Sequence, residues 1–509
     1  MPNKTKPLLS FFALSMMPVI DFSKWAGYLR FMNRPLNRPV LIFSVAFLLL
    51  FFFEKPAKSQ SFSGMEGSYW SGGTNAMRQP TSILGGGLRY DVSIIGFQQS
   101  FSNNFIGIRR SALFSESGTA WDSDSFRENY TVTRNNDRDK NASFNAEIPG
   151  ISFTMQIDGF NAFSVGVRAR NITWAHNFSP EFAELLYNGL DVPDLWTRLK
   201  DQNADLQSLG WTEYYGTYSR KILINEEHSI RVGGTMKLLQ GQFAGYFYLE
   251  DLDYEFLNDS VFNIYDTYIR YGLSGNPPFD GSGEDFNYGF NGKATFGFDF
   301  GAEYEYAPID KVPSSSKNPC HQAPYLLKAA FSITDIGAIK FPKSELTGDY
   351  YANATNIDIG DLAPESLEGF DSILNTFFTE LPSSANFNYQ LPLSINANLD
   401  YNIGKGFFAN FDMILSPRRN SNIAKVQYVS RFQLTPRWDS KWFGAYMPFS
   451  INTQGNFGLG LTLRAGPLII GTNDLTVLLG RKVIYAQEFH VALKVPIGFK
   501  CKKEATPME

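Results

Sequence analysis

The feature that most constrains the fold of this chain is a two-residue alternation of apolar and polar side chains, which recurs along most of the sequence. Residues 294–306 show it clearly, because Ala, Phe and Tyr occupy one parity and Thr, Gly, Asp and Glu occupy the other. Successive side chains of a strand point to opposite faces, so the pattern predicts a strand with one apolar and one polar face. The same pattern recurs at 163–171, 211–224, 230–238, 243–256, 325–341, 393–403, 407–415, 425–435, 442–451, 456–466 and 488–499.

The length of these segments indicates where the strands belong. We expect about 14 strands of roughly 9–14 residues, whereas strands of soluble proteins average about 5–6 and tilted strands that cross a bilayer need about 9–11. Charged residues on the polar faces cannot lie in a dry core, but they can line a wet lumen. The sequence therefore predicts an all-β fold, an antiparallel transmembrane β-barrel of about 14 strands. A large soluble β-sandwich or propeller is the alternative, although we find no repeat of about 40 residues that a propeller needs.

Composition excludes several other classes. Aromatic residues make up 16% and charged residues 19% of the chain, which argues against a disordered protein. The net charge of −5 offers no basic face for nucleic acid.

The N-terminal region resembles a targeting segment. The apolar run at 40–53 is too short for a membrane helix but fits the core of a signal peptide, with Arg34 and Arg38 before it. Ala57-Lys58-Ser59 fits a cleavage site, and Met32 is the predicted true start. We therefore assign 1–59 to a cleaved signal peptide, 60–87 to a turn-rich, plug-like segment, 88–499 to the barrel and 500–509 to a polar tail. An uncleaved membrane anchor is the alternative for the first region.

Two segments interrupt the alternation and are predicted to be helical inserts in loops. Residues 179–210 begin with Ser179 as an N-cap and Pro180 at the first helical position, and residues 361–380 carry an apolar stripe at helical spacing. Such helices either cap the barrel end or form a mouth that gates it or binds a partner. The mouth candidates are Phe182, Leu185, Leu186, Trp196, Leu367, Phe370, Ile373, Leu374 and Phe377.

The polar faces of the predicted strands supply the candidate lumen residues. Their charges either tune what passes through a pore or form a salt-bridge network that fills a closed barrel. The candidates are Arg168, Arg170, Arg231, Lys237, Asp299, Glu303, Glu305, Asp400, Asp412, Arg431, Glu488 and His490.

Catalytic and metal chemistry is weakly supported. Glu488 and His490 share one strand face, as a carboxylate–His pair would, but no serine has a convincing context. Cys320 beside His321 is weak evidence for a metal, and whether Cys320 pairs with Cys501 depends on a strand parity that the sequence leaves open. We predict no enzyme activity, no metal and no cofactor.

Several short motifs resemble a known family. They are Asn75 with Pro80-Thr81-Ser82-Ile83, the turn at 102–107, and the stretches 334–341 and 463–471. Together they resemble a Bacteroidota family of outer-membrane barrels catalogued as a domain of unknown function. That family is similar to fatty-acid-channel-like barrels and to the PorP/SprF and PorV barrels of type IX secretion. The resemblance implies a barrel of about 14 strands with an N-terminal plug and no catalytic residue. One departure from the usual pattern of such barrels concerns the C-terminus. Barrel assembly usually favours a terminal aromatic residue, whereas here Phe499 is followed by the polar tail 500–509.

We therefore expect an exported protein of a Gram-negative outer membrane that contacts lipid and binds no nucleic acid. The first functional hypothesis is a channel or binding barrel for passive uptake of a small hydrophobic molecule. The alternative is a non-transporting barrel that serves as a structural partner or as a secretion-system or envelope-protein partner. A secreted soluble β-protein such as an adhesin is a remote third option.

Overall fold

A computed structural model describes residues 62–84, 88–114, 124–188, 197–258, 261–275, 289–308, 325–345, 347–358, 367–417, 424–476 and 479–498. The predicted signal peptide, the polar tail and both cysteines lie outside these residues.

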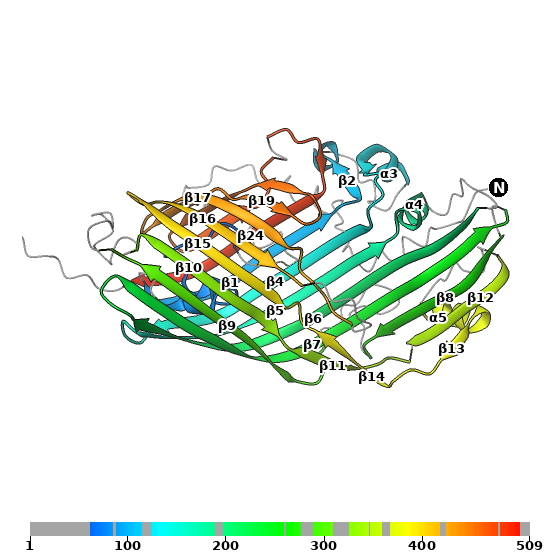
Figure 1. The fold of residues 1–509 in the computed structure, drawn as a ribbon, viewed down its shortest axis with the longest axis horizontal. Coiled ribbons are helices and arrows are strands. Elements are labelled where there is room, and N and C mark those ends of the chain that lie inside the picture. Colours follow the sequence, from blue (N-terminus) through cyan, green and yellow to red (C-terminus); the bar gives the residue numbers. More distant parts are fainter. Residues whose placement is uncertain are drawn as a thin grey trace, which may run out of the picture.

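The described strands close into a barrel of 14 antiparallel strands, as the alternation predicts (Figure 1). The closure is made by the first and last strands, which pair from Leu88 with Gly498 to Ser102 with Ala486. Around the ring the strands are β1 (Leu88–Asn103), β4 (Lys140–Gln156), β5 (Asn161–Phe178), β6 (Arg198–Leu223), β7 (His228–Phe256), β9 (Thr295–Tyr306), β10 (Leu327–Ile336), β15 (Ser394–Gly404), β16 (Phe407–Leu415), β17 (Arg431–Asp439), β18 (Phe443–Tyr446) continued by β19 (Phe449–Asn452), β20 (Phe457–Leu459) continued by β21 (Leu461–Ala465), β22 (Leu468–Thr472) and β24 (Ala486–Gly498).

The two ends of the barrel differ in their connections. Short turns at 157–160, 224–227, 405–406 and 466–467 join strands at one end, which we call the turn end. The opposite end, which we call the loop end, carries most of the longer insertions, although residues 307–326 join β9 to β10 at the turn end. The loop-end insertions include a small sheet of β2 (Ile106–Arg109), β3 (Thr131–Thr133) and β23 (Val483–Ile484), with the helices η5 (Arg110–Phe114) and α3 (Asp124–Tyr130) nearby.

Two strands run far beyond the barrel ring and build an extension at the loop end. β6 has 26 residues and β7 has 29, so both exceed the lengths expected from the sequence. The second half of β7 leaves β9 and pairs with β8 (Val261–Leu273). β8 pairs in turn with β12 (Gly348–Asp358), and β12 pairs with β13 (Thr379–Leu381). The segments 230–238 and 243–256, which the alternation suggested as separate strands, are thus one continuous strand.

The change of partner along β7 occurs beside Gly241. A Cβ atom at Gly241 would lie 2.4 Å from Cζ of Phe341, because the ring of that residue packs against the bare backbone. Phe341 belongs to β11 (Ala338–Pro342), which pairs with β14 (Asn386–Gln390). The missing side chain therefore lets a second layer approach the wall where β7 turns from barrel to extension.

The predicted helices are shorter than the segments assigned to them. α4 covers Pro180–Asn188, and residues from Arg198 onward form β6, so the prediction of a helical segment reaching residue 210 is wrong for 198–210. The α5 helix covers Leu367–Phe377 within the predicted 361–380. β-pairing with β7 determines the conformation of 198–210, and the local apolar spacing could not reveal that partner.

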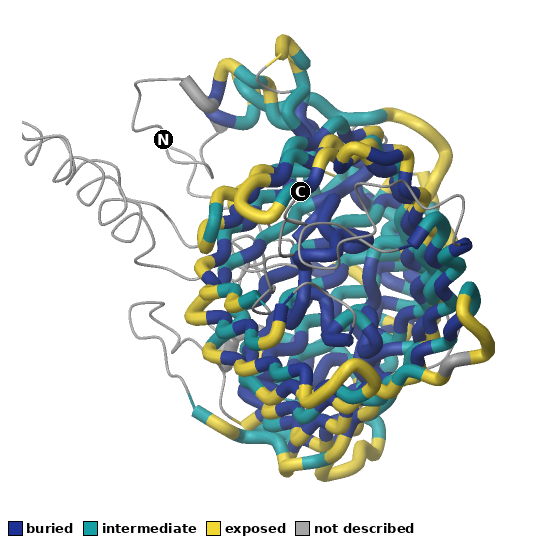
Figure 2. Tube along the Cα trace, turned by 90° about the vertical axis from the view of Figure 1, so that its left-hand side faces the viewer, coloured by how far each residue is buried: buried dark blue, intermediate teal, exposed yellow. Residues whose placement is uncertain are grey.

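The outward face of the ring is apolar. Phe296, Phe298 and Phe300 of β9 are 40–56% exposed, and Ile403 of β15 is 60% exposed. Figure 2 shows the converse arrangement, with the buried parts of the trace gathered inside the barrel. A contiguous exposed apolar surface of this kind is rare on a soluble monomer and is typical of a bilayer-spanning barrel.

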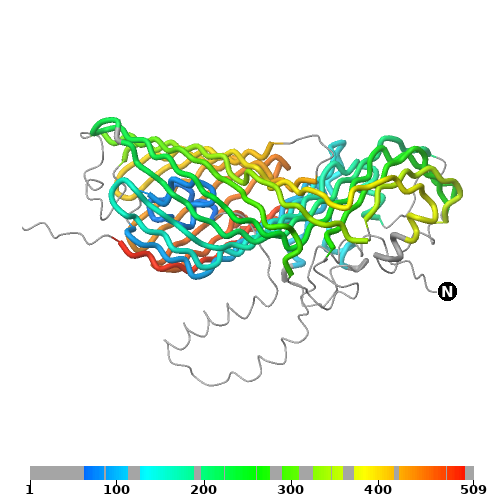
Figure 3. The backbone as a smooth tube through the Cα atoms, turned by 90° about the horizontal axis from the view of Figure 1, so that it is seen from below, coloured from blue at the N-terminus to red at the C-terminus, as the bar shows by residue number. Residues whose placement is uncertain are grey.

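Residues 62–84, which we call the plug segment, lie inside the barrel near its turn end (Figure 3). The segment contains two short 3₁₀ helices, η3 (Gly72–Asn75) and η4 (Pro80–Ile83), and turns between them. Among the described residues, no helix is both long and apolar enough to cross a membrane.

Candidate functional site

The wall presents its polar parity to the lumen, and the plug segment is bound there. On β24 the inward-facing Lys494 is 1% exposed, and its Nζ donates to the carbonyl oxygens of Trp70 and Ser71 at 2.8 and 2.9 Å. The same Nζ lies 3.2 Å from Oδ2 of Asp91 on β1, and this carboxylate also accepts the backbone N–H of Gly73 at 3.0 Å. One buried cation therefore fixes the backbone of the plug segment to two neighbouring wall strands.

The carbonyl group of Gly67 is held in a similar way from the other side of the plug segment. Nη2 of Arg437 on β17 donates to it at 3.0 Å, and Nζ of Lys328 on β10 donates at 3.1 Å. Arg437 also forms a two-pronged pair with Asp400 of β15, whose second oxygen accepts the hydroxyl of Tyr325. Charge-assisted bonds of this kind are stronger than neutral ones, so the plug segment is firmly anchored here.

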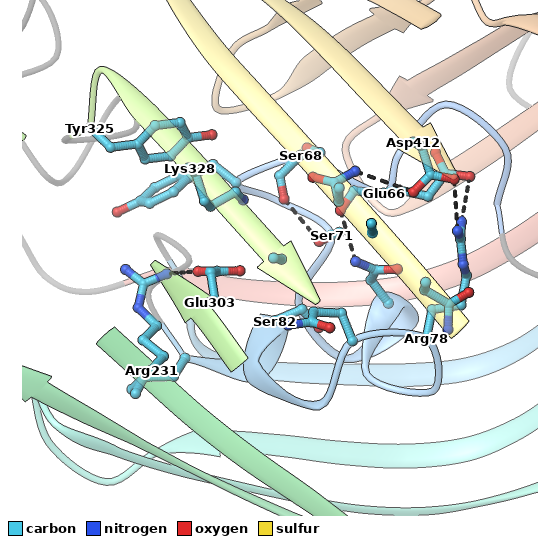
Figure 4. A pocket seen from close by; sticks show the side chains of 18 residues that line it. Glu66, Ser68, Ser71, Arg78, Ser82, Arg231, Glu303, Tyr325, Lys328 and Asp412 are labelled. Atoms are coloured by element: carbon cyan, nitrogen blue, oxygen red, sulfur yellow. Dashed lines mark hydrogen bonds and ion pairs between the residues drawn. The ribbon is translucent and has the colours of Figure 1, made fainter. Parts of the chain in front are cut away.

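Ion pairs also join plug side chains to the wall. Arg78 bridges Glu66 at 3.0 Å and Asp412 of β16 at 2.7 Å (Figure 4). Arg431 of β17 lies 3.6 Å from Glu66. Arg431 also pairs with Glu488 at 2.9 Å.

Burial changes the titration of the two plug residues. It raises the pKa of Glu66, with help from the negative charge of Asp412, while Arg78 and Arg431 oppose the shift. Burial also disfavours the charged guanidinium of Arg78, but the carboxylates of Asp412 and Glu66 outweigh it and raise the pKa of Arg78. The guanidinium of Arg78 therefore stays charged and holds the two carboxylates together.

A small cleft remains between the plug segment and the wall strands β7, β9, β10, β15 and β16. It holds about 570 Å³ of empty space, including solvent that reaches it. Arg231, Glu303 and Lys328 face it from the wall, and Arg231 forms an ion pair with Glu303 (Figure 4). Arg231 also pairs with Glu305.

A second group of ion pairs lies on the loop-end side of the plug segment and joins inward-facing side chains of the neighbouring strands β4, β5, β6, β7, β9 and β10. Arg170 pairs with Glu213 at 2.7 Å and with Asp335 at 2.8 Å, and Lys237 lies 2.7 Å from Asp335. Arg168 contacts Glu213 at 2.8 Å. We call the seven members the charged layer: Arg168, Arg170, Lys237, Glu147, Glu213, Asp299 and Asp335.

An apolar cluster packs against the charged layer. β11, β14 and residues 424–428 fold inward and pack with Trp211 and Leu239 of the wall. Trp211 is fully buried, and its Nε1 donates to Glu213 at 2.7 Å. Plug segment, charged layer and apolar cluster thus occupy successive parts of the lumen.

The structure places the twelve lumen candidates on the inner side of the wall, but in separate groups. Arg168, Arg170, Lys237 and Asp299 join the charged layer, whereas the others surround the plug segment. Glu488 and His490 are not hydrogen-bonded to each other, because Oε1 and Nδ1 are 3.8 Å apart. Nε2 of His490 instead lies 3.0 Å from Oγ1 of Thr462. Whether any of the twelve lines a transport path remains a prediction.

The described mouth candidates lie on the helices of the loop end, and several pack against the extension. Phe182, Leu185 and Phe377 pack partly buried against an apolar cluster of the extension, to which Leu374 belongs. Leu186 and Ile373 are half-buried. Trp196 and the side chains of Leu367 and Phe370 lie outside the described residues.

Sequence reasoning missed several of the residues that bind the plug segment. Lys494 and Arg437 share the polar parity of their strands with candidates that were chosen, so parity alone could have found them. Glu66 and Arg78 lie in the turn-rich segment, where no periodicity marks which side chains face the wall. Among the described residues, no cluster of His, Cys, Asp and Glu could hold a metal ion.

The barrel region of the chain matches a known protein family. Residues 88–473, from the start of β1 to just beyond β22, match the family of unknown function DUF5723. The chain belongs to this family. Membership agrees with the unknown-function family expected from the motifs, and the DUF5723 match leaves the plug segment and β24 outside its bounds. The suggested Bacteroidota origin and similarity to type IX barrels remain predictions.

Several solved barrels superpose on this DUF5723 member with low scores. A mutant of the monoaromatic hydrocarbon channel TodX has 8% identity, covers 86% of this chain and 99% of its own, and gives a TM-score of 0.40. A Pseudomonas aeruginosa FadL homologue has 9% identity, covers 87% and 100%, and gives 0.38. The Ralstonia pickettii toluene transporter TbuX has 10% identity, covers 86% and 98%, and gives 0.35. No curated protein sequence matches this chain.

Proposed function

We propose that this protein is an outer-membrane β-barrel channel that the plug segment holds closed, and that it passes small molecules once the plug segment moves. The observation that carries this proposal is the way the plug segment is held. Its backbone carbonyls are bound by the buried cations Lys494, Arg437 and Lys328, and its own ion pairs reach across to Asp412.

Placement in a membrane is supported by the apolar outer face. The exposed phenylalanines of β9 and isoleucine of β15 would be costly in water, and bilayer hydrocarbon is the solvent that suits them. The short turns and the plug segment share one end, and the extension lies at the other.

The substrate class is a separate part of the proposal. A small hydrophobic substrate is what the family resemblance implies, and we retain it as a prediction. The charged layer and the plug contacts are polar, so such a substrate would have to pass after these ion pairs separate. Opening of both barriers is therefore part of the proposed mechanism.

Planar-bilayer conductance tests the proposal. We would compare the signal-free protein with a variant lacking 62–84 and with a control variant lacking the polar tail 500–509. We expect more frequent openings from the first deletion than from the intact protein, each still requiring the charged layer to separate, and rare opening from both the intact protein and the tail deletion. A folded, inserted deletion variant that opens no more often than the intact protein would contradict the channel.

A non-transporting barrel is the second candidate, and the extension favours it. β6 and β7 carry a sheet and α5 well beyond the ring, which gives the loop end a large surface for a protein partner. Stoichiometric co-purification of an envelope protein that is lost when 261–273 and 348–381 are replaced by a short linker would support this role. A partner that still co-purifies would place its binding site elsewhere.

A further inference from the structure

A second cavity lies inside the barrel toward the loop end, and the channel proposal does not use it. β1, β4, β17, β19, β20 and β24 contribute to its walls, and it holds about 690 Å³ of empty space, counted with the solvent that reaches it. We call it the polar chamber. Its lining contains serine, asparagine and glutamine side chains in unusual number for a single cavity.

The register of three neighbouring strands creates one wall of the polar chamber. Ser100 of β1 pairs with Asn145 of β4 on one side and with Glu488 of β24 on the other. In the next row on the same face, Ser102 pairs with Ser143 and with Ala486. Small side chains in the second row leave space in front of the longer ones in the first.

Three buried atoms at the polar chamber have no hydrogen-bond partner among the described residues: Oδ1 of Asn145, Oε1 of Glu488 and Nε of Arg431. Asn145 is 6% and Glu488 is 7% exposed, so bulk water does not readily satisfy them. Buried polar atoms are nearly always hydrogen-bonded, and leaving one unpaired costs about 1–3 kcal/mol. Two free acceptors and one free donor therefore face a space that could hold a ligand.

The charges at the polar chamber are already balanced by the protein. Glu488 pairs with Arg431 at 2.9 Å, and Asp474 pairs with Arg481 at 2.7 Å. The remaining groups are neutral: Oγ of Ser102, for example, accepts from the side-chain amides of two asparagines at 2.9 and 3.1 Å. An ionic ligand would find no uncompensated charge, whereas a hydroxyl group both donates and accepts and matches a mixed set of partners.

We propose that the polar chamber binds a small, uncharged, polyhydroxylated molecule, that is, a sugar or polyol. Asn145 and Glu488 accept hydrogen bonds from its hydroxyl groups, and Nε of Arg431 donates to one. The site stands whether or not the barrel conducts, because none of these contacts requires the plug segment to move.

Titration calorimetry on the full-length protein, in a detergent without a sugar headgroup, tests the proposal. D-glucose, sucrose and glycerol are the probes, and glucosamine and gluconate are cationic and anionic comparators of glucose. We expect saturable binding of at least one neutral probe, and weaker binding of both charged comparators. Absence of binding by all three neutral probes, or preference for a charged comparator, would overturn the assignment.

Two variants locate the binding. Asn145→Leu keeps the shape but removes the free acceptor, and we expect about tenfold weaker binding. Ala486→Leu fills the space in the second row and is expected to abolish binding without removing a polar group. Asn396→Leu removes a buried lumen asparagine outside the polar chamber and serves as the control. Heat-modifiable migration verifies folding, and unchanged affinity in whichever of the two chamber variants folds would refute the site.

Discussion

Replacing Lys494 by Met tests directly how the plug segment is held. The substitution keeps the length of the side chain but removes the cation that binds the carbonyls of Trp70 and Ser71 and pairs with Asp91. Removing one partner of a buried charge pair typically costs about 3–5 kcal/mol, because the other charge stays buried and uncompensated. Since every 1.4 kcal/mol is about tenfold in an equilibrium, the ratio of docked to undocked plug should fall roughly 100- to 4,000-fold.

Single-channel recording measures this change as open probability. We expect Lys494→Met to open more often than the parent, up to the limit that the charged layer sets, and to show faster proteolysis within 62–84. Lys200→Met, on an exposed part of β6, is the matched control and should behave like the parent. The double variant Lys494→Met with Asp91→Asn should recover part of the loss, because it removes the orphaned carboxylate. An open probability for Lys494→Met no higher than that of the control would refute the reasoning.

Three further predictions concern other parts of the molecule. Gly241→Ala should destabilise the barrel by about 1–3 kcal/mol in urea unfolding from lipid bilayers, because the added Cβ would lie 2.4 Å from the ring of Phe341. Gly216→Ala is the control and should be nearly neutral, because no atom lies within 4 Å of its added Cβ. Phe300→Arg should cost about 2–4 kcal/mol in the same assay if the residue faces the bilayer midplane, and Phe300→Leu should cost little; equal stability of the two would argue against lipid contact. The pKa of Glu66 is raised in the folded protein, so its contribution to holding the plug segment is full at low pH and is lost as pH rises through that pKa. Open probability should accordingly increase as the pH is raised above the ordinary range of a glutamate carboxyl, and Glu66→Gln should flatten that dependence; a parent protein that opens more readily at the lower pH would contradict the sign.

The fold class could be predicted from the sequence because side-chain parity along a strand is a local property. In residues 294–306, side chains two positions apart lie on the same face, so their shared polar or apolar character identifies that face. The same rule assigned Lys237, Asp400 and Glu488 to the inner face before any strand partner was known. The extra length of the segments favoured a membrane barrel for the same local reason. The plug-like character of 60–87 was suggested by its turn-rich, non-alternating sequence and by the family resemblance.

The sequence could not show where a strand stops or which strand it pairs with. β7 continues through 243–256 because β8 replaces β9 as its partner, and residues 198–210 are extended because the same part of β7 pairs with them. Neither partner lies within the window in which alternation or helical spacing is read. In both segments, pairing with a neighbouring strand overrode the conformation that the local sequence favours, as is common in sheets.

What the sequence determined by itself is therefore the alternating strand, the closed all-β class and the polar character of the inner face. Only the tertiary structure decided which inward charges meet, for example Lys494 with carbonyls more than 400 positions earlier in the chain. The physical reason is that parity is set by the geometry of one strand, whereas contacts across a lumen depend on register and closure around the whole ring. The plug contacts, the charged layer and the polar chamber all arise from that closure.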